Sequence, residues 1–83
     1  MSDQVRVLFF ASLREEVGCG EVQVNACNTN DLLEVLALQL SPQAMLALSQ
    51  DNVRIAVNQQ LIEGNVALAD GDEVAFLPPV TGG

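Results

Sequence analysis

Hydrophobic positions along the chain follow two periods, and the period of two marks the strands. Residues 5–10 are rich in β-branched and aromatic side chains, which is typical of a strand. Polar and apolar positions alternate cleanly over residues 21–24, which predicts a second strand that pairs with the first. The full set of predicted strands spans residues 5–10, 21–24, 53–57, 61–62 and 73–77. Asp70-Gly71-Asp72 predicts a tight turn into the last of these strands.

Apolar positions at three- and four-residue spacing predict two helices in the middle of the chain. The first begins at the polar cluster 28–31, whose side-chain oxygens can accept hydrogen bonds from free backbone N–H groups, and runs to Leu40. The second begins at Ser41-Pro42, a capping serine followed by a proline in the first turn, and runs to Leu48. Residues 11–17 predict no more than a helical turn or a loop that ends at Gly18.

The element order β-β-α-α-β-β-β predicts an α+β fold, with one main helix packed across a mixed sheet and a short second helix. Successive side chains of a strand point to opposite faces. If the first and last strands lie side by side in the middle of the sheet, their outward side chains therefore converge. The converging set is Leu8, Phe10, Ala75 and Leu77, with Ala56 and Leu61 nearby. Exposed apolar patches of this kind mark interfaces, so we expect Phe10, Leu61 and Leu77 to contact a partner protein.

Residues 78–83, Pro78-Pro79-Val80-Thr81-Gly82-Gly83, follow the last strand and predict an extended tail. Proline cannot donate to a sheet and disfavours helix for the residue before it, so the domain is expected to span 1–77 and the tail 78–83. Such a tail reaches roughly 20 Å at about 3.3–3.6 Å per residue. Glycines without side chains could enter a narrow channel, although a frayed terminus is the alternative interpretation.

The composition of the chain limits the classes of partner that it can bind. With 83 residues and a net charge of −8, the chain has room for one domain, and its basic side chains are Arg6, Arg14 and Arg54. This charge disfavours nucleic acid and anionic membranes and favours a partner with a basic surface. No apolar run could span a bilayer, and the first residues lack the basic stretch of a signal peptide, so a cytoplasmic protein is expected.

Candidate chemistry within the chain is sparse. Histidine is absent, and the spacing of Cys19 and Cys27 fits no zinc motif. The acids of segment 70–73 are explained by a glycine-containing turn. We therefore expect no metal site, no cofactor held by this chain and little catalysis by this chain alone.

Three segments together carry a family resemblance. They are residues 7–11 (VLFFA), residues 57–59 (VNQ), and residues 68–83 (LADGDEVAFLPPVTGG). The chain resembles the small, sulfur-carrier subunits of molybdopterin synthase, which are ubiquitin-like β-grasp proteins. The D-G-D-E-V strand running into P-P-V-T-G-G is the specific part of the match. Residues 18–52 agree by element order alone.

The resemblance implies a chemical role for the tail. The Gly83 carboxylate would be adenylated by an E1-like enzyme that uses ATP, and a persulfide protein would supply sulfur to make a thiocarboxylate. The tail residues Pro78, Pro79, Val80, Thr81 and Gly82 would lie in the large synthase subunit, in a hetero-oligomer with two copies of each chain. Sulfur would there pass to the cyclic pyranopterin precursor.

Three other functions stay open at the level of the sequence. A thiamin-pathway sulfur carrier shares the glycine pair, although the two prolines followed by Val80-Thr81 favour the molybdopterin pathway. A protein modifier would join Gly83 to lysines of targets, and this chain has no lysine of its own on which to build polymers. A plain binding module would have a chemically inert tail.

Overall fold

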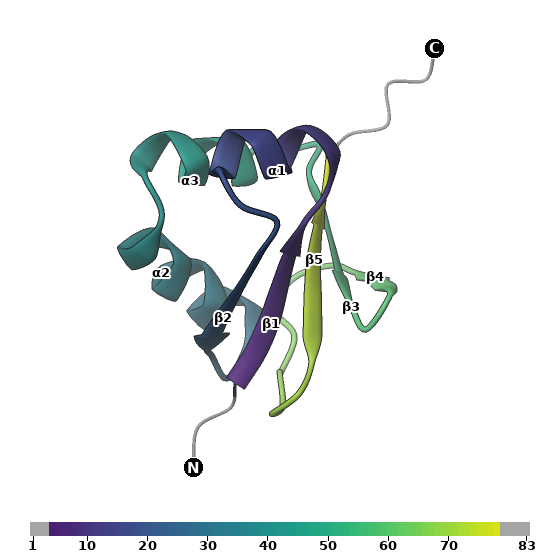
Figure 1. Cartoon of the computed structure of the whole chain (residues 1–83). Coiled ribbons are helices and arrows are strands. Elements are labelled where there is room, and N and C mark those ends of the chain that lie inside the picture. The colour runs from purple at the N-terminus through teal and green to yellow at the C-terminus, as the bar shows by residue number, and fades with distance from the viewer. Residues whose placement is uncertain (1–3, 79–83) are drawn as a thin grey trace.

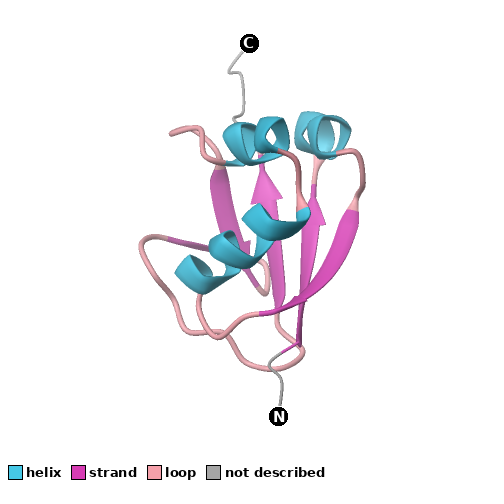
Figure 2. Cartoon of the chain, turned by 90° about the vertical axis from the view of Figure 1, so that its left-hand side faces the viewer, coloured by secondary structure: helices cyan, strands magenta, loops and turns pink. Residues whose placement is uncertain are grey.

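The computed structural model describes residues 4–78, which form one five-stranded sheet with three helices against one face (Figures 1 and 2). In chain order the elements are β1 Gln4–Phe9, α1 Ala11–Val17, β2 Glu21–Asn25, α2 Thr29–Gln39, α3 Pro42–Leu48, β3 Arg54–Val57, β4 Gln60–Ile62 and β5 Glu73–Leu77. The predicted strands and both predicted helices are therefore present, within one or two residues of the predicted bounds.

The sheet has the strand order β2-β1-β5-β3-β4. β1 and β5 are parallel neighbours in its centre, with Leu8 opposite Ala75, and every other pair is antiparallel. The prediction that the first and last strands lie side by side is confirmed. This arrangement, with a helix across the sheet, is a β-grasp (Figure 1).

α2 crosses the sheet diagonally, whereas α1 and α3 lie together at the end of the sheet where β1 and β5 finish (Figure 2). Both predicted caps are present. The Asn28 side chain accepts from the Asp31 N–H at 2.7 Å, and Ser41 Oγ accepts from the Ala44 N–H at 3.1 Å. These bonds satisfy backbone donors that have no partner within the helix.

The third helix, α1, is longer than in the sequence interpretation, which gave a short helical turn or a loop ending at Gly18. Two features stabilise it. Leu13 is 3% exposed and belongs to the core, and Gly18 ends the helix in a left-handed conformation with φ 94°. The Gly18 N–H donates to the Arg14 carbonyl at 3.0 Å. Apolar periodicity over seven residues is too short to distinguish such a helix from a loop.

The core lies between the sheet and the helices. Its fully buried large side chains are Val5, Val7, Leu32, Leu36, Val74 and Phe76. The rings of Phe9 and Phe76 stack across β1 and β5 with centroids 5.7 Å apart. Val57 on β3 is buried, while Ile55 on β3 and Val53 just before it are partly exposed because they pack at the margin of this core.

A two-residue turn joins β3 to β4 and is tied to β5. Asn58 and Gln59 have φ values of 50° and 70°, in the left-handed region. The Asn58 side-chain oxygen accepts from the Glu73 N–H at 3.1 Å, and its amide donates to Asp72 at 3.1 Å. These bonds set the position of the β3–β4 hairpin relative to β5.

Candidate functional site: an apolar groove beside the tail

The face of the sheet opposite the helices carries a row of apolar side chains. Leu8 pairs with Ala75, Ala75 with Ala56, and Ala56 with Leu61, so one residue from each of four neighbouring strands lies in register. A groove of about 320 Å³ follows part of this row. Its lining residues are Phe10, Ala56, Gln59, Leu61, Glu73, Ala75 and Leu77, and we call it the apolar groove.

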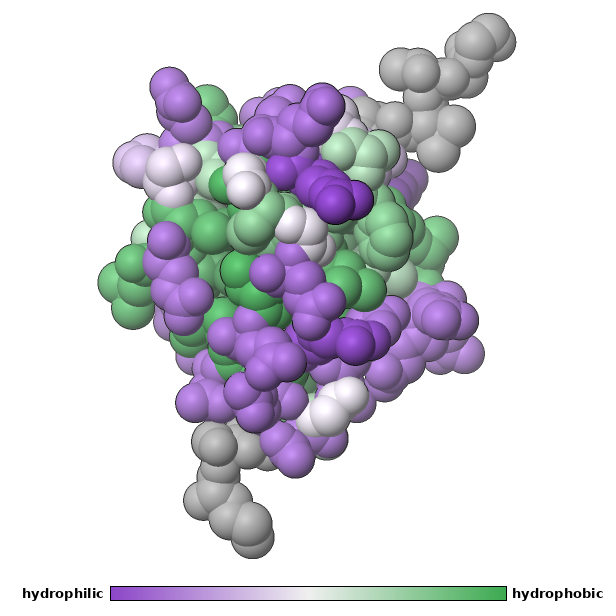
Figure 3. Space-filling model, viewed as in Figure 1, coloured by the Kyte–Doolittle hydropathy of each residue, from purple (hydrophilic) through white to green (hydrophobic). Residues whose placement is uncertain are grey.

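Small side chains form the floor of the apolar groove and larger ones form its sides. Ala56 and Ala75 are only 5% and 7% exposed, although they face away from the core, because their short side chains lie between larger neighbours. Phe10 is 44% exposed and Leu61 is 66% exposed. The three side chains predicted to bind a partner, Phe10, Leu61 and Leu77, thus line one groove. In the view of Figure 3, which is that of Figure 1, hydrophobic surface forms a band between hydrophilic residues above and below.

Phe10 lines the groove from the junction between β1 and α1, and not from within a strand. β1 ends at Phe9, one residue earlier than predicted, and Phe10 occupies the N-cap position of α1 in an extended conformation with φ −107°. Its N–H donates to the Phe76 carbonyl at 3.2 Å, so its backbone remains attached to β5. Ala11 then adopts φ 50°, a left-handed conformation that is uncommon for residues other than glycine. This bend starts the helix immediately after the exposed ring.

An ion-paired cluster lies at the end of the groove that is distant from Leu77. Arg6 Nη2 donates to Glu73 Oε1 at 2.6 Å, and Arg6 Nε lies 4.0 Å from Glu21 Oε2. The hydrogen bond to Glu73 and the negative charges of Glu21 and Glu73 raise the pKa of Arg6 above its ordinary value. Glu73 lines the groove, but its charge is largely compensated by Arg6.

Leu77 ends β5, and the half-buried Pro78 is the last described residue. The predicted tail positions Pro79, Val80, Thr81, Gly82 and Gly83 lie outside the described residues. Leu77 is thus both a wall of the groove and the root of the predicted tail.

The sequence interpretation missed one residue that lines the groove, Gln59. The left-handed turn at Asn58 and Gln59 brings its side chain there, and the predicted turn after Val57 was the signal in the sequence that could have identified it.

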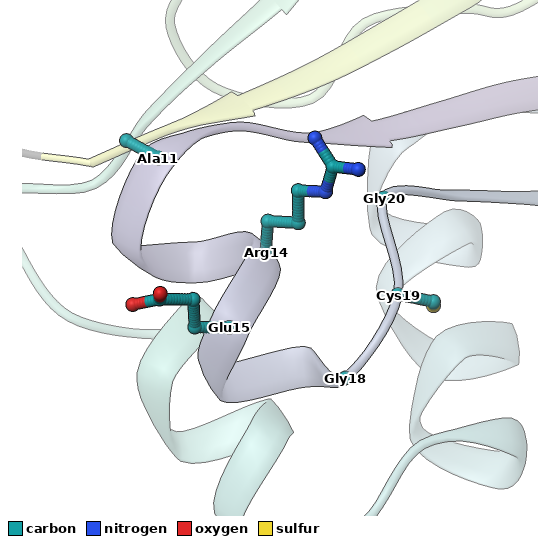
Figure 4. A pocket seen from close by; sticks show the side chains of 6 residues that line it. All are labelled: Ala11, Arg14, Glu15, Gly18, Cys19 and Gly20. Carbon is teal, nitrogen blue, oxygen red and sulfur yellow. The ribbon is translucent and has the colours of Figure 1, made fainter.

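A second hollow, of about 770 Å³, lies beside α1 and the following loop (Figure 4). The Arg14 guanidinium extends along the loop toward Gly20, whereas the Glu15 and Cys19 side chains point away from it. The residues that line this hollow include no acid–base or nucleophile–base pair.

Within residues 4–78, no group of three side chains from histidine, cysteine, aspartate and glutamate could hold a metal ion. No helix of this described part is long and apolar enough to cross a membrane.

Comparison with known proteins agrees with the fold and with the order of the motifs. The sequence model of the ThiS family matches residues 7–83. The molybdopterin synthase sulfur carrier subunit of Escherichia coli (strain K12) is 44% identical over 82 residues, covering 95% of this chain and 99% of that protein. The corresponding subunit of Haemophilus influenzae is 40% identical, with 95% and 99% covered.

Solved structures show the same fold. Small archaeal modifier protein 1 from Methanosarcina acetivorans superimposes with a TM-score of 0.82 at 26% identity, covering 100% of this chain and 99% of that one. A complex of subunits 1 and 2 of the molybdopterin-converting factor from Helicobacter pylori contains a chain with a TM-score of 0.70 at 28% identity, with 96% and 99% covered. The chain therefore belongs to the ThiS family and, within it, to the molybdopterin synthase sulfur carrier subunits.

Proposed function

We propose that this chain carries sulfur on the Gly83 carboxylate and delivers it to the cyclic pyranopterin precursor while docked on the large subunit of molybdopterin synthase. One observation carries the proposal. The side chains that the sequence predicts to bind a partner line an exposed apolar groove, and this groove adjoins the root of the predicted tail. The family match supports the assignment of the tail because it extends through Gly83.

The side chains of this chain indicate which chemical steps the partner proteins must catalyse. A free carboxylate is a poor electrophile because its oxygen is a poor leaving group. An E1-like partner would join the Gly83 carboxylate to AMP and release pyrophosphate from ATP. The outer sulfur of a persulfide protein would then displace AMP and form an acyl disulfide, and a second thiol would release the Gly83 thiocarboxylate by forming a disulfide with the donor cysteine. The chain has no histidine or lysine for acid–base catalysis, so the large subunit supplies these groups.

The groove supplies affinity and the tail supplies reach. Ordering a flexible residue costs about 1–2 kcal/mol, and proline lowers this cost because it is already restricted. Gly82 and Gly83 remain expensive to order, so binding energy comes mainly from the groove. Docking of the groove then presents the tail at a high effective concentration.

The proposed function also requires partner proteins. The Helicobacter pylori relative was solved in complex with subunit 2 of its molybdopterin-converting factor, which supports a hetero-oligomer for this chain. We propose two copies of each subunit in it. We propose the ATP-using enzyme and the persulfide protein as further partners, and the cytoplasm as the site of the reaction. ATP is used by the activating partner and is not a cofactor of this chain.

The test uses activation and mass together. The wild-type chain should support ATP–pyrophosphate exchange by the activating enzyme, and a chain lengthened by one residue past Gly83 should not. Mass spectrometry of the protein from its own cells should locate one oxygen replaced by sulfur at Gly83. Circular dichroism of both variants controls for the fold. Normal exchange by the lengthened chain would refute the proposal.

A second candidate is attachment to other proteins. The close superposition with a small archaeal modifier protein favours it, because the fold and the length of the two chains agree. A modifier would accumulate as covalent conjugates through Gly83, whereas a sulfur carrier would be recovered as the free thiocarboxylate. Detection of the tagged chain on denaturing gels, with a Gly83 deletion as control, separates the two.

A further inference from the structure

Arg54 lies beside the root of the tail, on the face of the sheet that carries the apolar groove. It is the first residue of β3 and pairs in register with Leu77, the last residue of β5. Side chains two residues apart on a strand share a face, so Arg54 lies on the same face as Ala56, which forms the groove floor. Arg54 is exposed.

The charge of Arg54 is not compensated within the described part of the chain. Arg6, at the other end of the same face, bonds Glu73 at 2.6 Å and lies 4.0 Å from Glu21. No carboxylate of residues 4–78 makes an equivalent pair with Arg54. Glu63, which follows β4 on the neighbouring strand, is exposed and makes no ion pair with it.

We propose that Arg54 forms an ion pair with a carboxylate on the large subunit, and that this acid marks where the tail enters its channel. The inference rests on the proposed docking of the groove. Opposed side chains on neighbouring strands lie about 4.5–5.5 Å apart at Cβ, so a partner that covers Leu77 also covers Arg54. Covering an unpaired guanidinium removes its water, and this penalty is offset only when the partner supplies an acceptor, best a carboxylate.

Net charge leads us to expect a basic partner surface, whereas the proposal places an acidic group of the partner opposite Arg54. A chain with a net charge of −8 favours a partner that is basic on average. On a uniformly basic surface, replacing Arg54 by an acid would strengthen binding. Opposite a carboxylate, the same change places two negative charges together and weakens binding. The sign of the effect therefore decides between the two surfaces.

The experiment measures the affinity of the purified large subunit for wild type, Arg54→Lys, Arg54→Gln and Arg54→Glu. The expected order runs from wild type, the tightest, through Lys and Gln to Glu. Loss of one partner of a covered charge pair predicts at least about thirtyfold weaker binding for Arg54→Gln and a larger loss for Arg54→Glu, mostly in the dissociation rate. Thermal melts should be unchanged because Arg54 is exposed.

Gln43→Glu is the matched control, because it changes the net charge by the same amount as Arg54→Gln from an exposed position on α3, on the helical side. It should bind like wild type. A charge reversal of one carboxylate on the large subunit should restore binding to Arg54→Glu. The proposal is overturned if Arg54→Glu binds as tightly as Arg54→Gln or more tightly, and the Lys and Gln variants give the same decision if the Glu variant does not fold.

Leu61→Ala keeps this test separate from that of the proposed function. If Leu61→Ala leaves binding unchanged, the groove is not the docking surface and the proposed docking fails. If Leu61→Ala weakens binding while Arg54→Glu does not, docking stands and the inferred carboxylate alone is refuted.

Discussion

Phe9 and Phe10 are neighbours in sequence with opposite environments. Phe9 is 2% exposed and stacks on Phe76 in the core, whereas Phe10 is 44% exposed on the groove. The change of face across one peptide bond is the alternation of an extended chain. Because β1 ends at Phe9, the position of Phe10 is set by its backbone N–H, which donates to the Phe76 carbonyl, and by the start of α1.

Because the two rings have different environments, we expect Phe9→Ala to reduce stability and Phe10→Ala to reduce partner binding. Phe9→Ala should lower the free energy of unfolding by about 3–5 kcal/mol, since it leaves a cavity in the core. Phe10→Ala should instead weaken binding to the large subunit by about 1–3 kcal/mol, with a smaller loss of stability. Urea denaturation and titration calorimetry measure the two quantities. Equal destabilisation by both variants, with unchanged binding, would contradict the assignment of Phe10 to the groove.

The β3–β4 hairpin and β5 meet at Asp72, just before the strand that leads to the tail. The Ala69 N–H donates to Asp72 Oδ2 at 2.8 Å, and the Asn58 amide donates to Oδ1 at 3.1 Å. These two bonds hold the pKa of the Asp72 carboxyl below its ordinary value of 3.8. The carboxylate thus connects the turn at Asn58 with the turn that begins β5, and both place groove residues.

A lowered pKa has a definite sign in the pH dependence of stability. Asp72 stabilises the fold at pH values above 3.8, and this contribution is lost as the pH falls through the lower folded-state pKa. Asp72→Asn should therefore unfold at lower urea concentration than wild type at neutral pH. The difference should shrink in acid, where both side chains are uncharged. A difference that is constant across this range would show that the charge of Asp72 has no role.

At the scale of the whole molecule, charge and groove act at different stages of binding. Under the proposed docking, the net charge of −8 acts over distance and should affect the association rate, whereas apolar contact in the groove should act after encounter. Glu73 is paired with Arg6 at the end of the groove distant from Leu77, so it is poorly placed to steer the approach of a partner to the tail. Exposed acids without such a partner, among them Glu15 on α1, are better placed for this role.

Salt should separate these contributions. The association rate with the large subunit should fall as ionic strength rises, while the dissociation rate changes less, because screening weakens long-range attraction first. Glu15→Gln should slow association more than Glu73→Gln, which removes a carboxylate already neutralised by Arg6. Stopped-flow measurements across a salt series test both statements. An association rate independent of salt would refute steering.

Sequence by itself determined the five strands, the two longer predicted helices α2 and α3, and the inward faces of β1 and β5. The alternation in β1 and β5 and the caps at Asn28 and Ser41 act over a few residues, so their signals are contained in short segments. The predicted partner-binding residues Phe10, Leu61 and Leu77 followed from the same alternation, once β1 and β5 were taken as neighbours. The roles of the tail residues remain predictions.

Tertiary structure alone decided what depends on distant residues meeting. α1 forms because Leu13 reaches the core, and its seven residues carry too weak a local pattern to predict it. Arg6 bonds Glu73 across 67 positions of sequence, and Arg54 faces Leu77 through the register of β3 with β5. Local periodicity specifies which face of a strand a residue occupies, but the residue opposite it is set by strand pairing, and that pairing left Arg6 neutralised and Arg54 without a partner in the described chain.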